Sequence, residues 1–394
     1  MGKSPTQVLV VDDEEDLELL VRQKFRRRIR EGHLRFLFAH NGKEALEVLQ
    51  ECPDVYLVLS DINMPVMDGL TLLGQLADGE KDIQAVIVSA YGDMRNIRTA
   101  MNRGAFDFLT KPIDFNDLEA TIEKGLKHVQ ALQRALETRD RLVAVNQELD
   151  MARDVQMSFQ PDALPANEHH DVKAVIIPAR EVGGDLYDFF FIDTSHLGLV
   201  IADVSGKGVP AALFTTVTRA LLRATASKDF STPGECLTMV NDLLCENNPS
   251  CTFITLFFGV LDLRTGELSY SNAGHNPPRV LRAGSGVDVV PKTGNLVLGI
   301  QQEHKYHNGQ IQLAPGDTLF LYTDGITEAE DSKSAEFSES RLDERLAELS
   351  GASSERVLTD VVDAVQEFVG DAVQSDDITC LAARFLAPLS VHPS

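Results

Sequence analysis

Two sets of charged and polar residues in this sequence have the types and spacing that phosphate chemistry needs. In the first 112 residues, polar side chains directly follow strand-like apolar runs, at Asp12, Asp13, Asp61, Ser89 and Lys111. Because clustered carboxylates repel one another, a hard divalent cation such as Mg²⁺ is their natural counter-charge. Lys111 can pair with Asp61, and the Ser89 hydroxyl can bond a phosphoryl oxygen. This set predicts formation of an acyl phosphate on Asp61.

The second set lies in the C-terminal half, where acidic residues adjoin glycine-containing turns or a further aspartate. The four points are Gly183-Gly184-Asp185, Asp203-Val204-Ser205-Gly206, Thr323-Asp324-Gly325 and Ser375-Asp376-Asp377. Glycines permit tight turns, so carboxylates from distant strands can converge on one pocket. Oxygen-only ligands favour Mg²⁺ or Mn²⁺, and two such ions can activate a shared water for phosphoryl displacement. This set predicts hydrolysis of a phosphate ester.

Each of these residues taken alone has a plainer explanation. An aspartate at a strand end often caps the next helix, and Asp-Gly turns are common in proteins that bind nothing. His275 could serve as an acid for the leaving group or as a hydrogen-bonded scaffold residue. Lys207 lacks the surrounding pattern of a nucleotide-binding loop and is interpreted as exposed.

The segment that must position the first set alternates short apolar runs with amphipathic stretches. Five such βα units predict a doubly wound, parallel, five-stranded sheet within a first domain, residues 1–114. The strand-like runs are Val8–Val11, Leu34–Ala39, Val55–Ser60, Ala85–Ser89 and Asp107–Thr110. In open sheets of this kind, ligands bind at the carboxyl ends of the strands, where the polar residues are found.

Residues 115–160 contain little glycine or proline and predict a long helical linker. Apolar residues recur at spacings of three and four, which suits a coiled coil that joins two copies into a homodimer. The register breaks around Thr138–Arg141. The alternative is a single amphipathic helix packed on its own domains.

Residues 161–394 combine many strand-like runs with grouped helices, so this domain is predicted as α+β. The expected strands are Lys173–Ile177, Leu197–Asp203, Phe253–Asp262, Leu268–Ala273, Thr318–Tyr322 and Ile378–Phe385. The expected helices are Val209–Thr225, Gly234–Cys245, Ser340–Leu349 and Ser354–Val369. The whole chain is thus a multidomain α/β plus α+β protein.

The composition excludes several classes of protein. The chain has 394 residues with 36 Lys and Arg against 60 Asp and Glu, a net charge of −24 that disfavours nucleic-acid and anionic-membrane partners. No apolar stretch approaches the roughly 20 residues of a membrane span, and we expect a cytoplasmic protein. The five cysteines form no metal-binding pair and are interpreted as reduced packing residues.

The motifs VVDDEE, SDINMPVMDG, VSAYGD and FLTKP resemble the receiver domains of two-component response regulators over residues 7–125. The resemblance implies that Asp61 is the phosphoacceptor and that a sensor histidine kinase or another phosphotransfer donor supplies the phosphoryl group. It implies Mg²⁺ ligands at Asp12, Asp13, Asp61 and the backbone carbonyl of Asn63. Ser89 and Lys111 would read the phosphate, and Phe108 occupies the position of the family's aromatic switch.

The motifs EVGGDLYDFF, IADVSGKGVPAALF, NAGHNPP, LYTDGITEAED and SDDITCL resemble the PP2C-type serine/threonine phosphatases of the SpoIIE and RsbU branch, over residues 150–386. The resemblance implies a β-sandwich flanked by helices, with two Mn²⁺ or Mg²⁺ ions. Asp203 would bridge the ions beside the Val204 carbonyl, and Asp185, Asp324 and Asp376 would complete the ligand shells. Asp377 is an adjacent candidate, because the sequence does not tell which of the two neighbours faces the metals.

The two resemblances together imply a stress-response regulator in which phosphorylation of Asp61 controls a phosphatase. In this branch the substrates tend to be phosphorylated anti-sigma-factor antagonists. A similar architecture occurs in RssB-type adaptors, which bind a sigma factor or a component of an anti-sigma system without catalysis. Retention of the four aspartates favours an enzyme, because an adaptor has no physical need for them. The charge and the lack of a basic helix disfavour a DNA-binding output.

Overall fold

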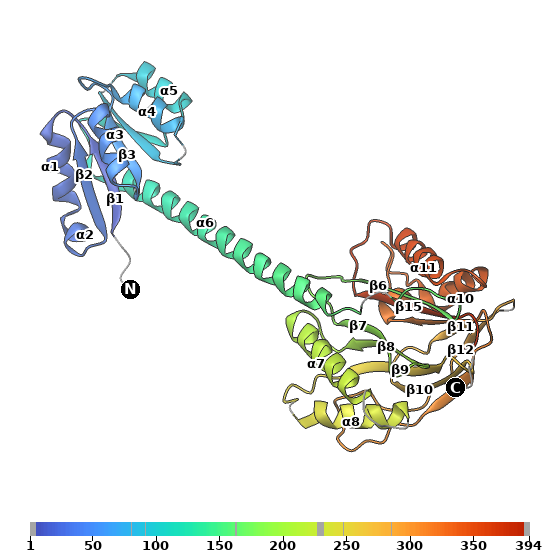
Figure 1. Ribbon diagram of the computed structural model, residues 1–394. Helices are drawn as coiled ribbons and strands as arrows, with labels where there is room; N and C mark the ends of the chain where they lie inside the picture. The colour runs from blue at the N-terminus through green and yellow to red at the C-terminus, as the bar shows by residue number, and fades with distance from the viewer. Residues whose placement is uncertain are drawn as a thin grey trace. The chain divides into compact units, whose positions relative to one another are not determined.

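The computed structural model describes residues 5–79, 81–90, 92–161, 164–226, 232–246, 248–284 and 286–389. The chain forms two compact units, Met1–Ala144 and Val145–Ser394 (Figure 1). None of the helices in the described ranges combines the length and the hydropathy needed to cross a bilayer.

The first unit is built on a parallel sheet of five strands in the order β2-β1-β3-β4-β5. The strands are β1 (Thr6–Val11), β2 (Leu34–Ala39), β3 (Val55–Asp61), β4 (Gln84–Ala90) and β5 (Asp107–Lys111). The helices between them are α1 (Glu15–Lys24), α2 (Arg26–Arg30), α3 (Gly42–Glu51), α4 (Gly69–Ala77) and α5 (Met94–Asn102). Neighbouring residues of β3 enter different hydrophobic clusters, Val58 on one face and Leu57 and Leu59 on the other. The predicted doubly wound sheet is confirmed.

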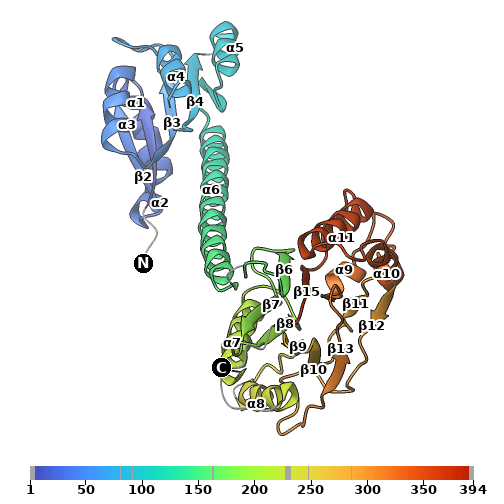
Figure 2. The same ribbon diagram turned by 45° about the vertical axis from the view of Figure 1, so that its right-hand side comes forward.

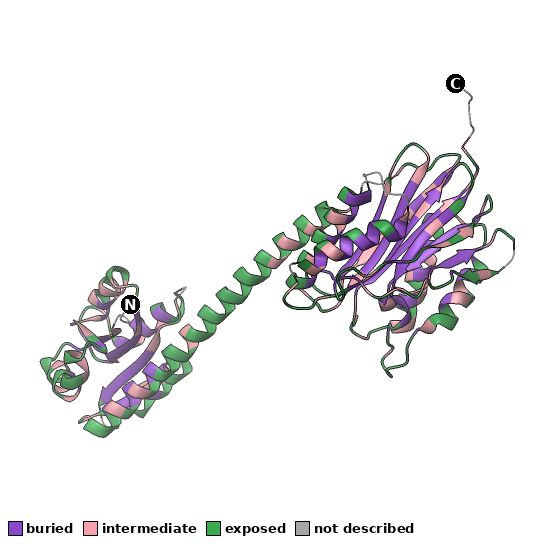
Figure 3. Ribbon diagram, turned by 90° about the horizontal axis from the view of Figure 1, so that it is seen from below, coloured by how far each residue is buried: buried purple, intermediate pink, exposed green. Residues whose placement is uncertain are grey.

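A single helix of 44 residues, α6 (Phe115–Ser158), follows β5. Leu118, Ile122 and Leu126 recur every four residues and are buried against the sheet of the first unit. Beyond Val129 the helix is largely exposed, as the green stretch in Figure 3 shows. It continues unbroken through Thr138–Arg141, where the apolar register changes. The boundary at residue 114 stays a prediction, as do the coiled coil and the dimer.

The second unit is a sandwich of two sheets, each with five strands and antiparallel neighbours, in the orders β13-β10-β9-β8-β7 and β12-β11-β14-β15-β6 (Figure 2). The first sheet comprises β7 (Asp185–Phe191), β8 (His196–Val204), β9 (Ile254–Asp262), β10 (Glu267–Ala273) and β13 (Gly309–Gln312). The second comprises β6 (His170–Ile177), β11 (Arg279–Leu281), β12 (Val287–Val289), β14 (Thr318–Tyr322) and β15 (Ile378–Phe385). Leu199 and Phe257 of the first sheet pack on Leu319 and Leu381 of the second.

Helices cover both outer faces of the sandwich. Helices α7 (Val209–Ala226) and α8 (Pro233–Glu246) share a hydrophobic cluster with the first sheet. Helices α10 (Ser338–Glu348) and α11 (Ser354–Val369) share one with the second sheet, near the short α9 (Asp324–Thr327). The predicted β-sandwich flanked by helices is therefore confirmed.

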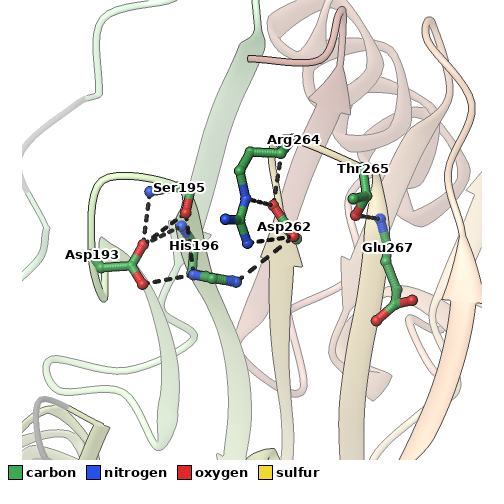
Figure 4. Close-up of polar contacts among 7 residues, drawn as sticks. All are labelled: Asp193, Ser195, His196, Asp262, Arg264, Thr265 and Glu267. Atoms are coloured by element: carbon green, nitrogen blue, oxygen red, sulfur yellow. Dashed lines mark hydrogen bonds and ion pairs between the residues drawn. The ribbon is translucent and has the colours of Figure 1, made fainter. Parts of the chain in front are cut away.

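A polar network holds two neighbouring turns of the first sheet, β7–β8 and β9–β10 (Figure 4). Asp193 accepts hydrogen bonds from the backbone amides of Ser195 and His196, and its second oxygen lies 2.7 Å from His196 Nδ1. Asp262 accepts two hydrogen bonds from the Arg264 guanidinium. Asp185 begins β7 and Asp203 lies near the end of β8, so the turn between these strands is at the far end of the hairpin from both aspartates. The network therefore stabilises the hairpins at the end away from these residues.

Candidate functional site

The acidic residues of the first unit gather at the carboxyl ends of β1 and β3. Carboxylate oxygens of Asp12, Asp13 and Asp61 all lie within 4.8 Å of one another. Lys111 Nζ is 2.5 Å from Asp61 Oδ2 and 3.2 Å from Asp12 Oδ2. Burial raises the pKa of Asp12, although the Glu14 amide and Lys111 act against this effect. Apart from its ion pair with Lys111, the buried Asp12 Oδ2 has no polar partner among the described residues. Such a buried, under-satisfied oxygen beside two other carboxylates fits a divalent cation.

The remaining predicted residues of this unit lie on β4 and β5 or directly after β3. The Asn63 amide donates to Asp61 Oδ1 at 3.3 Å, and Ser89 is fully buried on β4, the strand next to β3. Phe108 lies on β5 with 38% of its surface exposed. Gly69 approaches the Asp61 carbonyl so closely that a Cβ atom there would overlap it. The structure thus brings the predicted polar residues to the carboxyl end of the sheet, whereas Phe108 lies three residues before Lys111 on β5. The roles of all these residues stay predictions.

In the second unit, Asp185 and Asp203 stand directly opposite each other on the antiparallel strands β7 and β8. Burial raises the pKa of Asp185 well above its usual range, and the charge of Asp203 adds to this effect. Burial, followed by repulsion from Asp324 and Asp376, raises the pKa of Asp203 to about 7. The Thr323 hydroxyl donates a 2.8 Å hydrogen bond to Asp185 Oδ2 and holds that carboxylate in place.

The other two predicted carboxylates come from the second sheet. Asp324 follows β14 and Asp376 precedes β15, and these strands are hydrogen-bonded neighbours. Burial and then the charge of Asp376 raise the pKa of Asp324. Carboxylates from both sheets therefore meet at one end of the sandwich, with Val204 at the end of β8. Burial and repulsion within the set raise the pKa of Asp185, Asp203 and Asp324, and a set of carboxylates of this kind suits an oxygen-binding divalent cation. The set is more open than the one in the first unit, because in the described structure no three of its carboxylates lie within 4.8 Å of one another.

Asp376 and Asp377 have different surroundings. Asp377 is buried, and its oxygens accept hydrogen bonds from the backbone amides of Ala179, at 2.7 Å, and Gly184, at 2.6 Å. Gly325 lies against the Asp377 carbonyl, where a Cβ atom would overlap it. The Asp376 side chain is 46% exposed and faces Lys207. Asp377 therefore holds the turn that leads to Asp185, whereas Asp376 is open to a ligand.

Lys207, interpreted from the sequence as exposed, is 41% exposed but has specific partners. Its ammonium group lies 2.8 Å from Asp376 Oδ2 and donates to the Ser375 carbonyl at the same distance. The sequence offered one signal, the position of this lysine between two glycines just before α7. Its acidic partner lies 169 residues away, so no local pattern could identify the pair.

His275 is buried and both of its ring nitrogens have partners. Nδ1 lies 2.9 Å from the Thr255 hydroxyl, and Nε2 lies 3.1 Å from the Tyr322 carbonyl, which can only accept a hydrogen bond. Burial lowers the pKa of His275 to about 4. A neutral, fully bonded imidazole agrees with the scaffold alternative and not with an acid for the leaving group.

The end of α6 contacts the turn that carries Asp185. The Gln156 side chain donates to the Gly183 carbonyl at 2.8 Å and accepts from the Gly183 amide at 3.2 Å. One turn later, Gln160 accepts a 2.9 Å hydrogen bond from the Tyr187 hydroxyl on β7. The sequence resemblance identified this helix segment but not its contact with the Gly-Gly-Asp turn.

Large parts of the chain are similar to known proteins. The chain is 32% identical over 266 residues to Protein IcfG of Synechocystis, covering 60% of this chain and 41% of IcfG. It is 26% identical over 270 residues to phosphoserine phosphatase RsbU of Bacillus subtilis, covering 68% of this chain and 79% of RsbU. The chain thus spans less than half the length of IcfG.

The fold of the second unit has a solved counterpart. The SiaA-PP2C domain of Pseudomonas aeruginosa superposes with a TM-score of 0.56 at 24% identity, covering 62% of this chain and 98% of that domain. Models of two families match separate regions, the response regulator receiver domain at residues 8–123 and stage II sporulation protein E (SpoIIE) at residues 193–386. The chain therefore carries a response regulator receiver domain followed by a PP2C-type phosphatase domain of the SpoIIE family.

Proposed function

We propose that the chain is a response regulator in which phosphorylation of Asp61 controls metal-dependent hydrolysis of phosphoserine or phosphothreonine on a partner protein. The observation that carries the proposal is the placement of Asp185, Asp203, Asp324 and Asp376 at one end of the sandwich, where burial and repulsion raise the pKa of the first three. The name of RsbU, a phosphoserine phosphatase, supports the same reaction class.

In the receiver domain, Asp61 would accept a phosphoryl group from a phosphohistidine or another phosphodonor. Mg²⁺ held by Asp12, Asp13, Asp61 and the Asn63 carbonyl would neutralise phosphate charge when bound. Lys111 already lies 2.5 Å from Asp61 and is held there by its carboxylate partners, so it can pair with the added phosphoryl oxygens. Ser89 would donate its hydroxyl to the same group.

In the phosphatase domain, two Mg²⁺ or Mn²⁺ ions held by the aspartates and the Val204 carbonyl would lower the pKa of a shared water and bind the phosphate. The chain's own residues fix the arrangement around them. Thr323 orients Asp185, and Asp377 holds the Gly183–Asp185 turn through backbone amides. Lys207 provides a cation beside Asp376 that can pair with a phosphate oxygen of the substrate.

Helix α6 is the candidate for coupling the two activities. Its first turns belong to the receiver core, and Gln156 near its end holds the Gly183 turn that leads to Asp185. A rotation or shift of the helix would therefore move a backbone segment that carries a candidate metal ligand. Exposed apolar side chains along the helix, Leu136, Leu142 and Val145 among them, support pairing with a second copy.

The proposed substrate class rests on the resemblance of the C-terminal motifs to the SpoIIE and RsbU branch, in which the substrates tend to be anti-sigma-factor antagonists. The match to phosphoserine phosphatase RsbU is consistent with a phosphoserine substrate. We therefore propose a phosphorylated anti-sigma-factor antagonist as the substrate. An adaptor that binds a sigma factor without catalysis is the alternative that the assay below separates.

The test is turnover of p-nitrophenyl phosphate and of phosphorylated candidate partners by the full chain, with and without Mn²⁺. We expect turnover only with the metal, and a loss of at least a hundredfold in Asp203→Asn, because the central carboxylate is removed. Addition of acetyl phosphate should change the rate, in either direction, in the wild type only and not in Asp61→Asn. Absence of metal-dependent turnover in the wild type would leave the adaptor as the better explanation.

A further inference from the structure

A pocket of ≈ 350 Å³ opens beside the candidate active site of the phosphatase domain. It lies between the end of α11, the segment that leads into β15, and the region around α9. The apolar residues that line it are Ala329, Val365, Val369, Ala372, Val373 and Ile378.

The pocket is continuous with the carboxylate cluster. Asp376 belongs to both, and Gly325, which also lines the pocket, directly follows Asp324. An extended chain advances about 3.3 Å per residue. If a phosphorylated residue of the substrate binds at the aspartates, a neighbouring residue one to three positions away in the substrate chain would therefore have its side chain over the pocket.

The lining has the character of a ligand site. Val365 and Ile378 form a buried apolar floor, whereas the Val373 side chain at the edge is 92% exposed. Polar groups, including Glu330 and Gln366, stand around this apolar centre. Ligand pockets commonly combine an apolar lining with a few polar groups, and an apolar group bound here would remove the exposed valine surface from water.

The wall that carries Val373 is held in place. Gln374 donates hydrogen bonds to the carbonyls of Ile177, at 2.8 Å, and Asp376, at 2.7 Å. At the other end of this segment, Gly370 terminates α11 with a φ of +59°. The segment that carries Val373 is therefore tethered to β6 and to the residue that it shares with the carboxylate cluster, Asp376.

We propose that this pocket is a specificity subsite, which accepts an apolar side chain of the protein substrate from a residue near the phosphorylated one. The proposal rests on the proposed function, since the phosphate must lie at the aspartates. A segment of the substrate fits better than a separate small molecule, because the pocket shares Asp376 with the carboxylate cluster and Gly325 of its lining directly follows Asp324. The carboxylates of Glu330 and Asp376 at its edge disfavour an acidic side chain in the same place.

The test uses the full chain with Mn²⁺ and a set of phosphoserine heptapeptides with Leu or Asp at each flanking position. At one flanking position or more, we expect Leu to exceed Asp by about tenfold in kcat/KM, since apolar pockets discriminate by about 10–200-fold. In Val373→Glu the preference should fall to about twofold, and the ratio of peptide to p-nitrophenyl phosphate kcat/KM should fall with it. The control is Val289→Glu, a charge added at a 52% exposed valine of the edge strand β12, which should keep the preference.

The outcomes separate the two proposals. Turnover of p-nitrophenyl phosphate with no preference among peptides, or a preference that survives Val373→Glu, would overturn the subsite and leave the phosphatase intact. A change of sedimentation mass in Val373→Glu would show that a second copy of the chain occupies the pocket, and would also overturn the proposal. No Mn²⁺-dependent turnover of any compound would overturn the proposed function and the subsite with it.

Discussion

Substitution by asparagine should mainly lower the stability of the domain at Asp377 and mainly lower turnover at the neighbouring Asp376. In Asp377→Asn, one of the two oxygens that bind the Ala179 and Gly184 amides becomes an NH₂ group, which faces a backbone N–H. A buried donor loses a charged acceptor, at a cost of about 1.5–3 kcal/mol, and the contact between two donors adds to it. We expect a free energy of unfolding lower by about 3 kcal/mol.

Asp376→Asn removes a half-exposed carboxylate whose ion pair with Lys207 contributes about 0–1 kcal/mol. Its loss also relieves repulsion with Asp324, so the stability should change by less than about 1 kcal/mol. Turnover, in contrast, should fall at least a hundredfold, and the Mn²⁺ concentration for half-maximal rate should rise. Asp377→Asn should retain measurable turnover, at a rate lowered through the displaced Gly183–Asp185 turn.

Differential scanning calorimetry of the full chain measures the first effect. At about 2–4 °C per kcal/mol, the phosphatase transition of Asp377→Asn should lie about 6–12 °C lower, while that of Asp376→Asn stays within a few degrees. The p-nitrophenyl phosphate assay across a Mn²⁺ titration measures the second. Unaltered melting in Asp377→Asn together with complete loss of turnover would refute the assignment, because it would make Asp377 the ligand.

Other perturbations test the remaining contacts. Asp203→Asn should abolish Mn²⁺-dependent turnover, while acetyl phosphate still labels the receiver of this variant. Asp61→Asn should block that labelling, which phosphate-affinity electrophoresis measures. Gln156→Ala should reduce at least twofold the rate change that acetyl phosphate causes, while Gln147→Ala, at an exposed position of the same helix, should not. Burial lowers the pKa of His275 to about 4, whereas the pKa in the unfolded chain is about 6.5. Between these two pH values the unfolded state binds more protons, so the free energy of unfolding falls as the pH drops from about 6.5 to 4. This loss, up to about 3 kcal/mol, should be smaller in His275→Gln, as urea unfolding across that pH range would show.

The sequence predicted most of the receiver because its signals are local. In β1, β3, β4 and β5 a site residue stands at or next to the end of the strand, so the element and the chemistry appear in one motif such as VVDDEE. The helix Ser354–Val369 was likewise predicted with the observed bounds, since its apolar residues follow one periodicity throughout.

The phosphatase domain was less predictable where pairing decides the structure. Strand β7 was not predicted, because Asp185–Phe191 carries buried aspartates within its apolar run. The short edge strand Gly309–Gln312 has a single apolar residue, Ile311, so its alternation is too brief to predict a strand, and it is defined by its pairing with β10. The choice between Asp376 and Asp377 depends on amides that lie more than 190 residues earlier, which no local pattern contains.

The hydrogen bonds of Gln156 and Gln160 determine where a fragment that contains the phosphatase domain alone should begin. A fragment that starts at residue 161 would lack both glutamines and would leave the Gly183 amide and the Tyr187 hydroxyl without these partners. The first turn to loosen would be the one that presents Asp185. An excised catalytic fragment should therefore begin inside α6, upstream of residue 156, and the two start points should differ in turnover even if both polypeptides fold.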